Sequence, residues 1–343
     1  MHLTALRSAI HPTILVLAAF CLFQSPAAPE DAPLPPGKLV ELGGHRLHVN
    51  CTGQGRPVVV VENGLGDFSF DWILVQQRVA RFTRICTYDR AGYAWSDAGP
   101  MPRTFAQINL ELREALRVLG ERGPFVLVGH SYGGPVMRNF ATTWPAEVAG
   151  MVFVDAAWEG MRVQIGEKQT VRLGGSGQER AVPKPHERWT ASDKDALRAM
   201  AEPPHPAEPL DPLYQKLPEA EQRLQQWAQN LPNLEPTEAS QRQWSEVDFA
   251  RLLAHPEPHA LRSIPTIVLS RSEGGYTSDL DVPAAQMEQE RKDGQAMLAR
   301  LSKKSKQVFL HCGHNMEIED PAGVADAIQQ AVEAARHRGN LQT

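Results

Sequence analysis

The sequence predicts an α/β fold, a mostly parallel eight-stranded sheet with helices on both faces and an inserted helical lid, or cap. Short apolar runs alternate with longer helical patterns over most of the 343 residues, which is the order expected of strands joined by crossover helices. The runs are continuously apolar, which is typical of strands buried on both faces of a parallel sheet. One long segment, 158–262, lacks such a run and therefore predicts an insertion.

A β-hairpin opens the predicted sheet. Residues 38–42 and 46–50 flank Gly43 and Gly44, and paired glycines between two strands favour a tight turn. Six more apolar runs complete the eight strands, at residues 58–61, 84–88, 125–128, 151–154, 266–269 and 307–310. Helical patterns between and after these runs predict helices at residues 72–80, 106–119, 134–144 and 322–336.

The insertion divides the chain into a core and a lid. The core comprises residues 38–157 and 263–340, and the lid comprises residues 158–262, which are rich in Pro, Glu, Gln and Trp. An amphipathic pattern at residues 219–231 predicts that the lid is helical. A long disordered loop is the alternative, but the large Trp side chains of the segment need a surface on which to pack.

The first 29 residues have the layout of a secretory signal peptide. Arg7 supplies positive charge, residues 14–23 are apolar, and residues 25–27 (Ser-Pro-Ala) offer small residues at the positions that a signal peptidase reads. The apolar stretch is shorter than the roughly 20 residues that span a membrane. We therefore expect a secreted or periplasmic protein. An N-terminal anchor that is retained is the alternative, and only then would the membrane be a partner.

The composition is that of an ordinary globular protein and argues against a nucleic-acid partner. Apolar residues make up 42% and charged residues 22% of the chain, and the formal net charge is −5. Binding to phosphates needs a clustered basic face, and the sequence has no run of Lys or Arg that would form one. It also has no metal-ligand cluster and no nucleotide-binding loop, so we expect no cofactor and no metal. The oligomeric state is not predicted.

The strongest motif is a Gly-x-Ser-x-Gly sequence formed by Gly129, Ser131 and Gly133. It lies directly after the apolar strand 125–128 and directly before the helix 134–144, and this context makes the motif specific. Such a turn forces the Ser into a strained conformation and places its hydroxyl at a helix N-terminus, where negative charge is favoured. Ser131 is therefore the predicted nucleophile.

A serine hydroxyl is a weak nucleophile at neutral pH and needs a neighbouring base. His314 is the candidate, because it lies on a loop just after the last predicted strand and follows Gly313. The position of this residue, rather than its type, distinguishes it from the other histidines of the chain.

Two further motifs accompany the nucleophile and the base. Residues 63–66 read Asn-Gly-Leu-Gly, close to a His-Gly-x-Gly oxyanion loop with Asn in place of His. Residues 89–92 and Ser96 are similar to an Asp-x-Arg-Gly-x-Gly-x-Ser signature, but are shifted and have Ala94 in place of the second Gly. With these motifs the chain resembles the α/β-hydrolase superfamily, from about residue 38 to the C-terminal helix.

The resemblance implies an oxyanion hole and a third catalytic residue. The main-chain N–H groups of Leu65 and Tyr132 would stabilise the negative oxygen of a tetrahedral intermediate. The superfamily usually places its acid after the strand 266–269, where Glu273 is the nearest carboxylate. A variant places it after the preceding strand, where Asp155 ends the run 151–154 directly. We favour Asp155, which would orient His314, and Glu273 remains the alternative.

The resemblance also implies a disulfide. In the strand order of the superfamily, the second hairpin strand lies beside the strand 84–88. Cys51, at the end of the first of these strands, and Cys86, within the second, could then form a cross-strand bond. Export would permit this bond. Two small buried thiols are the alternative. Cys312 is expected to have a packing role.

The predicted chemistry is acyl transfer to water, with a small ester-like molecule as substrate. Ser131 would attack the carbonyl while His314 takes the proton, and water would hydrolyse the acyl-enzyme. The Trp residues of the lid suggest an apolar acyl or aromatic group. A cofactor-free perhydrolase, an acyltransferase, a C–C bond hydrolase and a peptidase are alternatives on the same residues. A non-catalytic binding module of the same fold is a further alternative, which the intact Ser131 and His314 argue against.

Overall fold

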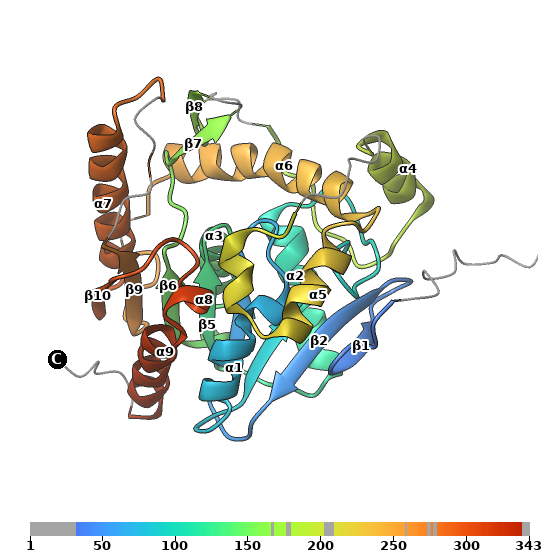
Figure 1. Cartoon of the computed structure of the whole chain (residues 1–343), viewed down its shortest axis with the longest axis horizontal. Helices are drawn as coiled ribbons and strands as arrows, with labels where there is room; N and C mark the ends of the chain where they lie inside the picture. Colours follow the sequence, from blue (N-terminus) through green and yellow to red (C-terminus); the bar gives the residue numbers. More distant parts are fainter. Residues whose placement is uncertain are drawn as a thin grey trace, which may run out of the picture. The chain divides into compact units, whose positions relative to one another are not determined.

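The computed structural model of the protein describes residues 32–165, 168–175, 180–201, 209–257, 259–272, 276 and 280–337. The predicted leader, residues 1–29, lies outside the described residues, as does Glu273. The unit that carries the fold begins at Pro35, and Figure 1 shows its elements.

An eight-stranded sheet forms the centre of this unit, in the order β1-β2-β4-β3-β5-β6-β9-β10. β2 is antiparallel to both of its neighbours, β1 and β4, and all other neighbouring strands are parallel. The strands are β1 (Lys38–Glu41), β2 (Arg46–Thr52), β3 (Val59–Glu62), β4 (Ile85–Tyr88), β5 (Phe125–His130), β6 (Val148–Val154), β9 (Thr266–Arg271) and β10 (Ser305–Leu310). The predicted fold class is therefore confirmed.

Helices pack on both faces of the sheet because the central strands are apolar on both sides. Val59 and Val61 of β3 lie in a core cluster with α1 (Ile73–Val79) and α9 (Pro321–Arg336). Val60, on the opposite side of the same strand, lies in a second cluster with α2 (Phe105–Val118), α3 (Gly133–Thr143) and α7 (Ala284–Arg300). Successive side chains of a strand point to opposite faces, which explains the division between the two clusters.

The four predicted core helices correspond to α1, α2, α3 and α9, but α7 was not predicted. Its 17 residues include few large apolar side chains, so they carry no clear helical stripe. Gly294 of α7 packs on Trp158, since an added Cβ at Gly294 would overlap the indole ring. Three short helical turns complete the core: η1 (Ser69–Trp72), η2 (Pro145–Glu147) and α8 (Met316–Glu319).

The insertion lies between β6 and β9 and contains both helices and a small hairpin. Its elements are β7 (Arg162–Ile165), β8 (Gln169–Arg172), α4 (Ala191–Ala199), η3 (Pro212–Lys216), α5 (Glu219–Ala228) and α6 (Leu234–Ala254). In Figure 1, α6 crosses above β5 and β6. The antiparallel pair β7–β8 was not expected, because its residues are largely exposed and show no buried-strand pattern.

Buried hydrogen bonds join α6 to the core at two places. Asp248 accepts a hydrogen bond from the main-chain N–H of Phe105, at the start of α2, with 3.0 Å between the atoms. The hydroxyl of Tyr93 donates to Gln241 over 3.0 Å. Burial raises the pKa of Asp248 to about 6. The insertion is therefore attached to the core by directional contacts as well as by apolar packing, and its role as a lid stays a prediction.

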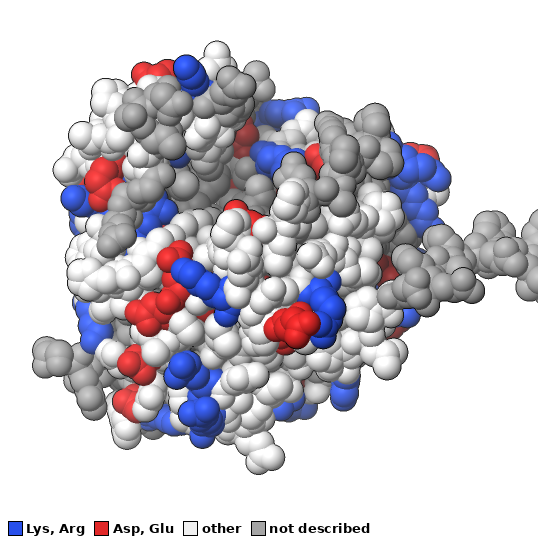
Figure 2. Space-filling view, viewed as in Figure 1, with Lys and Arg blue, Asp and Glu red and all other residues white. Residues whose placement is uncertain are grey.

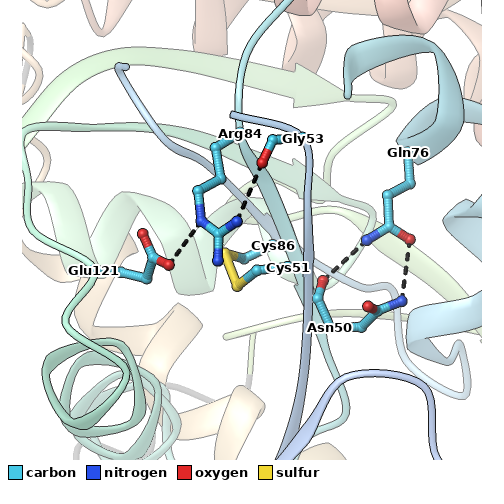
Figure 3. Close-up of a disulfide and its surroundings, with 7 residues drawn as sticks. All are labelled: Asn50, Cys51, Gly53, Gln76, Arg84, Cys86 and Glu121. Atoms are coloured by element: carbon cyan, nitrogen blue, oxygen red, sulfur yellow. Dashed lines mark hydrogen bonds and ion pairs between the residues drawn. A yellow bond between two sulfur atoms is a disulfide. The ribbon is translucent and has the colours of Figure 1, made fainter. Parts of the chain in front are cut away.

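A disulfide joins Cys51 and Cys86, which face each other in the antiparallel register of β2 and β4. Figure 3 shows the surrounding hydrogen bonds: Arg84 donates to Glu121 over 2.7 Å and to the main-chain oxygen of Gly53 over 3.1 Å. The structure thus forms the bond that the resemblance implies, and Cys312 is a buried free thiol.

The surface and the helices give two further observations. On the face shown in Figure 2, acidic and basic side chains are interspersed. Among the described residues, none of the helices combines the length and the apolar character that crossing a bilayer requires.

Candidate active site

Ser131 lies between the end of β5 and the start of α3, in a backbone conformation that few residues adopt. Its φ is 48°, in the left-handed region that is costly for a residue with a Cβ. Three main-chain hydrogen bonds hold it there: its N–H donates to Val154 over 3.1 Å, and its oxygen accepts from Gly134 and Ala157 over 3.0 and 2.9 Å. Ser131 is thereby tied to the segment that follows β6.

The glycines of the motif are required by close packing. A Cβ at Gly129 would lie 2.6 Å from the main-chain oxygen of Gly133. A Cβ at Gly133 would lie 2.8 Å from the oxygen of Asn63 and would also overlap that of Glu62. Both distances are shorter than non-bonded atoms tolerate, so only Gly permits this turn from strand to helix.

Asp155 and His314 form a hydrogen-bonded pair at the same end of the sheet. Asp155 directly follows β6 and also has a positive φ, 37°. Its Oδ2 lies 2.7 Å from Nδ1 of His314, on the loop between β10 and α8. Because an ionised carboxylate only accepts hydrogen bonds, Nδ1 of His314 carries the proton and Nε2 is left as the acceptor in the neutral ring.

The surroundings of this pair favour a neutral His314 and an ionised Asp155. Burial by itself would raise the pKa of the Asp155 carboxyl, but the hydrogen bond from His314 and the charges of Arg271 and Arg291 outweigh it and lower that pKa. Burial lowers the pKa of His314; Asp155 opposes this effect, and the positive charge of His130 adds to it. The imidazole is therefore an available base at neutral pH.

Two arginines beside Asp155 were not singled out in the sequence. Nη1 of Arg271, the last residue of β9, lies 3.2 Å from Oδ2 of Asp155. Nη1 of Arg291, on α7, lies 3.9 Å from Oδ1. A signal for Arg271 was present, because a charged residue ends an otherwise apolar strand at the edge where Asp155 also lies. Arg291 gave none, since α7 itself was not predicted.

The loop 63–66 is held by the buried guanidinium of Arg90. Nη1 of Arg90 donates to the main-chain oxygen of Asn63 over 2.8 Å, and Nη2 donates to that of Gly64 over 2.5 Å. Nη1 also pairs with Glu62 over 2.8 Å, and both side chains are fully buried. A charged group that donates to two consecutive carbonyl oxygens restrains the loop. The main-chain N–H groups of the loop are not used by this contact.

The main-chain N–H groups of Leu65 and Tyr132 are available as donors. Neither makes a hydrogen bond to another group in the part of the chain that the structure describes. Tyr132 precedes the first residue of α3, where N–H groups have no partner within the helix. Tyr132 directly follows Ser131, and Leu65 packs against the apolar cluster that contains Tyr132. Two donors of this kind suit a developing negative oxygen, which is the role predicted for them.

The structure thus brings Asp155 and His314 into direct contact and ties the backbone of Ser131 to the segment that carries Asp155. The alternative acid, Glu273, lies outside the described residues. His130, for which the sequence predicted no role, lies against His314, with 4.7 Å between the ring centroids. Its place inside the Gly-x-Ser-x-Gly motif was the signal that could have drawn attention to it.

Comparisons with other proteins agree with this architecture. The model of the alpha/beta hydrolase family matches residues 58–327. A probable transporter, efuK, of Hormonema carpetanum is 36% identical over 129 residues, which are 35% of this chain and 18% of that protein. An AB hydrolase superfamily protein of Gibberella zeae is 33% identical over 108 residues, 30% of this chain and 34% of that protein. The chain therefore matches only a minor part of the length of these relatives.

Solved structures share the fold at low sequence identity. A thermophilic esterase from Thermogutta terrifontis superposes with a TM-score of 0.55 and 20% identity, covering 87% of this chain and 99% of that one. A meta-cleavage product hydrolase from Pseudomonas fluorescens gives a TM-score of 0.58 and 17% identity, covering 88% and 98%. Because the family model matches most of the chain, the chain belongs to the alpha/beta hydrolase family.

Proposed function

We propose that the protein is a serine hydrolase that cleaves a carboxylic ester, or a related acyl bond, through an acyl-enzyme on Ser131. The observation that carries the proposal is the hydrogen bond of 2.7 Å between His314 and Asp155, at the end of the sheet where Ser131 follows β5. Family membership supports a hydrolase in general, and the arrangement of these three residues supports the more specific proposal.

The proposed reaction has two half-reactions. Oγ of Ser131 attacks the carbonyl carbon while its proton passes to Nε2 of His314, and the carbonyl oxygen becomes negative beside the N–H groups of Leu65 and Tyr132. His314 then returns the proton to the leaving alcohol, and the bond between carbonyl and alcohol oxygen breaks. In the second half, water gives its proton to His314 and attacks the acyl carbon, which releases the acid and regenerates Ser131.

One further protein of similar structure is named as an epoxide hydrolase, CorEH. A serine nucleophile argues against epoxide opening by this chain. A serine that attacked the carbon of an epoxide or an alkyl halide would form an ether, which water does not cleave under mild conditions. An acyl group on Ser131, in contrast, is readily hydrolysed. Ester-like substrates therefore fit Ser131 better.

An apolar acyl group fits the surroundings of the two oxyanion residues. Leu65 and Tyr132 belong to an apolar cluster against which half-buried Met161, Leu173 and Leu252 of the insertion pack. Trp227, whose residue type suggested an apolar pocket, packs instead on Trp95, with 5.2 Å between the ring centroids. We therefore propose that the acyl chain lies beside Met161 and Leu173.

A panel of p-nitrophenyl esters of graded acyl length tests the proposal. We expect turnover that rises from acetyl to medium-length acyl groups and that is abolished in Ser131→Ala. Parallel assays with an amide, a peracid and an alcohol acceptor separate the esterase from a peptidase, a perhydrolase and an acyltransferase. Absence of turnover on every acyl donor, in folded protein, would leave the non-catalytic binding module as the better description.

We also propose that the protein is exported, with residues 1–29 as the signal. The disulfide between Cys51 and Cys86 supports this, because such bonds persist in oxidising compartments. N-terminal sequencing of the natural protein would find a start after the leader if it is a signal peptide, and an intact leader if it is an anchor.

A further inference from the structure

A second buried ion cluster lies directly against His314. His130, the last residue of β5, is 1% exposed. Its Nδ1 lies 2.9 Å from Oδ2 of Asp67, and its Nε2 lies 3.1 Å from the main-chain oxygen of His314. Oε2 of the buried Glu317, on α8, lies 3.8 Å from the same Nε2. None of these contacts is used in the chemistry described above.

The two partners of His130 determine the protonation of its ring. A main-chain carbonyl oxygen only accepts hydrogen bonds, so Nε2 must donate to His314 and carry a proton. Burial by itself would raise the pKa of Asp67, but the hydrogen bond and the charge of His130 outweigh burial and lower it. The carboxylate of Asp67 is therefore an ionised acceptor, and Nδ1 carries a proton as well. Both nitrogens are then protonated, and His130 is an imidazolium buried between two acidic side chains.

We propose that His130 is a positioning residue, a permanent buried cation that fixes the loop of His314 and keeps His314 in the unprotonated form that accepts the proton of Ser131. This inference rests on the proposed roles of Ser131 and His314. It adds a function for the residue that precedes the nucleophile in the motif.

The geometric part of the role is a link between three loops. Asp67 follows the oxyanion loop after β3, His130 ends β5 and leads into the turn that carries Ser131, and the carbonyl of His314 belongs to the loop after β10. Gly64 packs against the same ring, because a Cβ there would lie 2.9 Å from Nδ1 of His130. One imidazolium therefore sets the spacing of the oxyanion donors, the nucleophile and the base.

The electrostatic part of the role follows from the closeness of the two rings. Their centroids lie 4.7 Å apart, and a fixed positive charge at this distance disfavours a second one on His314. Burial opposes the charge of His130, but Glu317 and Asp67 outweigh burial and raise the pKa of His130 to about 10. The cation therefore persists over the pH range in which His314 titrates.

Other titratable groups also face this pair. Asp155 and Arg271 act on His314 from the ends of β6 and β9. Asp71 of η1 and Tyr214 of η3 lie near Asp67, and burial raises the pKa of both. Burial also raises the pKa of Glu317 to about 7, although His130 opposes this. The substitution His130→Gln removes the charge of His130 and leaves the other groups that act on His314 in place.

The test compares His130→Gln with a matched control, His311→Gln, an exposed histidine close to His314 on the same loop. The rate at which a fluorophosphonate modifies Ser131 is measured as a function of pH, since this rate follows neutral His314. In His130→Gln we expect the acidic limb of the pH profile to move to higher pH. The rate at about pH 6, divided by the plateau rate of the same protein, should then be about threefold smaller in the variant than in wild type. His311→Gln should coincide with wild type.

A second readout does not depend on activity. In protein with ¹⁵N-labelled histidine rings, NMR should show both nitrogens of His130 protonated at about pH 8, where ordinary histidines are neutral. In Asp67→Asn, which keeps an acceptor but removes the negative charge, His130 should lose a proton at lower pH than in wild type.

Three results would overturn the inference. They are an acidic limb in His130→Gln that coincides with wild type, a neutral His130 ring at about pH 8 in wild type, and a stoichiometric metal ion that wild type holds and His130→Gln lacks. The last is included because donor atoms of Asp67, His130 and Glu317 lie within 4.8 Å of one another. Failure of wild type to be labelled on Ser131 would contradict the proposed function instead, and the NMR readout would still decide the charge of His130.

Discussion

Oδ2 of Asp155 lies 2.7 Å from Nδ1 of His314, although the two residues are 159 positions apart in the chain. The carboxylate that contacts His314 therefore follows β6, whereas β9 ends in a cation, Arg271. Burial opposes the charge of Asp155, but the hydrogen bond from His314, with the charges of Arg271 and Arg291, outweighs burial and lowers the pKa of Asp155, so this carboxyl stays ionised. An ionised acid fixes the tautomer of His314 that leaves Nε2 ready to accept a proton.

Replacing Asp155 by Ala or Asn should lower kcat by about 10³–10⁴, because His314 loses its orientation and its preferred tautomer. Steady-state kinetics on the best ester of the panel would measure the loss. Glu273→Gln is the matched control and should keep turnover close to wild type. Near-full turnover in Asp155→Ala, with a large loss in Glu273→Gln, would show that the acid was assigned to the wrong strand.

The activity should depend on pH through His314. Only the neutral ring accepts the proton of Ser131, so kcat/KM falls as the pH drops through the pKa of His314. Burial and the charge of His130 lower this pKa from its ordinary value of 6.5, and the acidic limb should therefore lie below that pH. The pKa of Asp155 is also lowered, so this carboxylate stays ionised across the limb. An acidic limb well above neutral pH would contradict this environment.

Arg90→Met should lower the free energy of unfolding by about 3–5 kcal/mol, because it leaves Glu62 buried without its cationic partner, with only the hydroxyl of Tyr88 still donating to it among the described residues. It should also lower turnover in the folded fraction, since the carbonyls of Asn63 and Gly64 lose their donor. Urea denaturation and ester kinetics measure the two effects separately.

Arg113→Met is the control for this substitution. Arg113 pairs with Glu147 at 2.7 Å, but the side chains are 41% and 30% exposed, so the loss should be about 0–1 kcal/mol with no change in turnover. Equal losses of unfolding free energy in Arg90→Met and Arg113→Met would show that the burial of the pair between Arg90 and Glu62 does not determine its contribution to stability.

The sequence was sufficient for the sheet and for the turn that carries Ser131, because their signals are local. The runs of Val in β3, β5 and β6 reflect burial on both faces, and the elbow at Ser131 needs glycines at fixed spacing. In contrast, α7 is defined by contacts such as Gly294 against Trp158, which a pattern of apolar residues does not reveal.

The partners of the site residues could not be derived from local pattern. Arg271 reaches Asp155 only because β6 and β9 are neighbours in the sheet. His130 meets Asp67 and His314 because the loops after β3, β5 and β10 converge at one end of it. Such contacts depend on the order of the strands, which propensity and spacing alone leave open. The resemblance supplied that order for Cys51 and Cys86.

Removing the disulfide by the double substitution Cys51→Ala and Cys86→Ala should lower the free energy of unfolding by about 2–4 kcal/mol, because the bond closes a loop of 35 residues in the unfolded chain. Denaturant titration measures the loss. Thiol counting on denatured wild type that lacks residues 1–29 should find Cys312 alone; three reactive thiols would show that the bond is absent.

The most direct test of the central claim is labelling of the folded protein with a fluorophosphonate, followed by peptide mass spectrometry. We expect one adduct, on Ser131, that does not form when the protein is heat-denatured before labelling and that forms much more slowly in His314→Ala, since the label requires a serine activated by its base. A folded protein that acquires no adduct on Ser131, or that is labelled equally fast without His314, would contradict the assignment of Ser131 as the nucleophile.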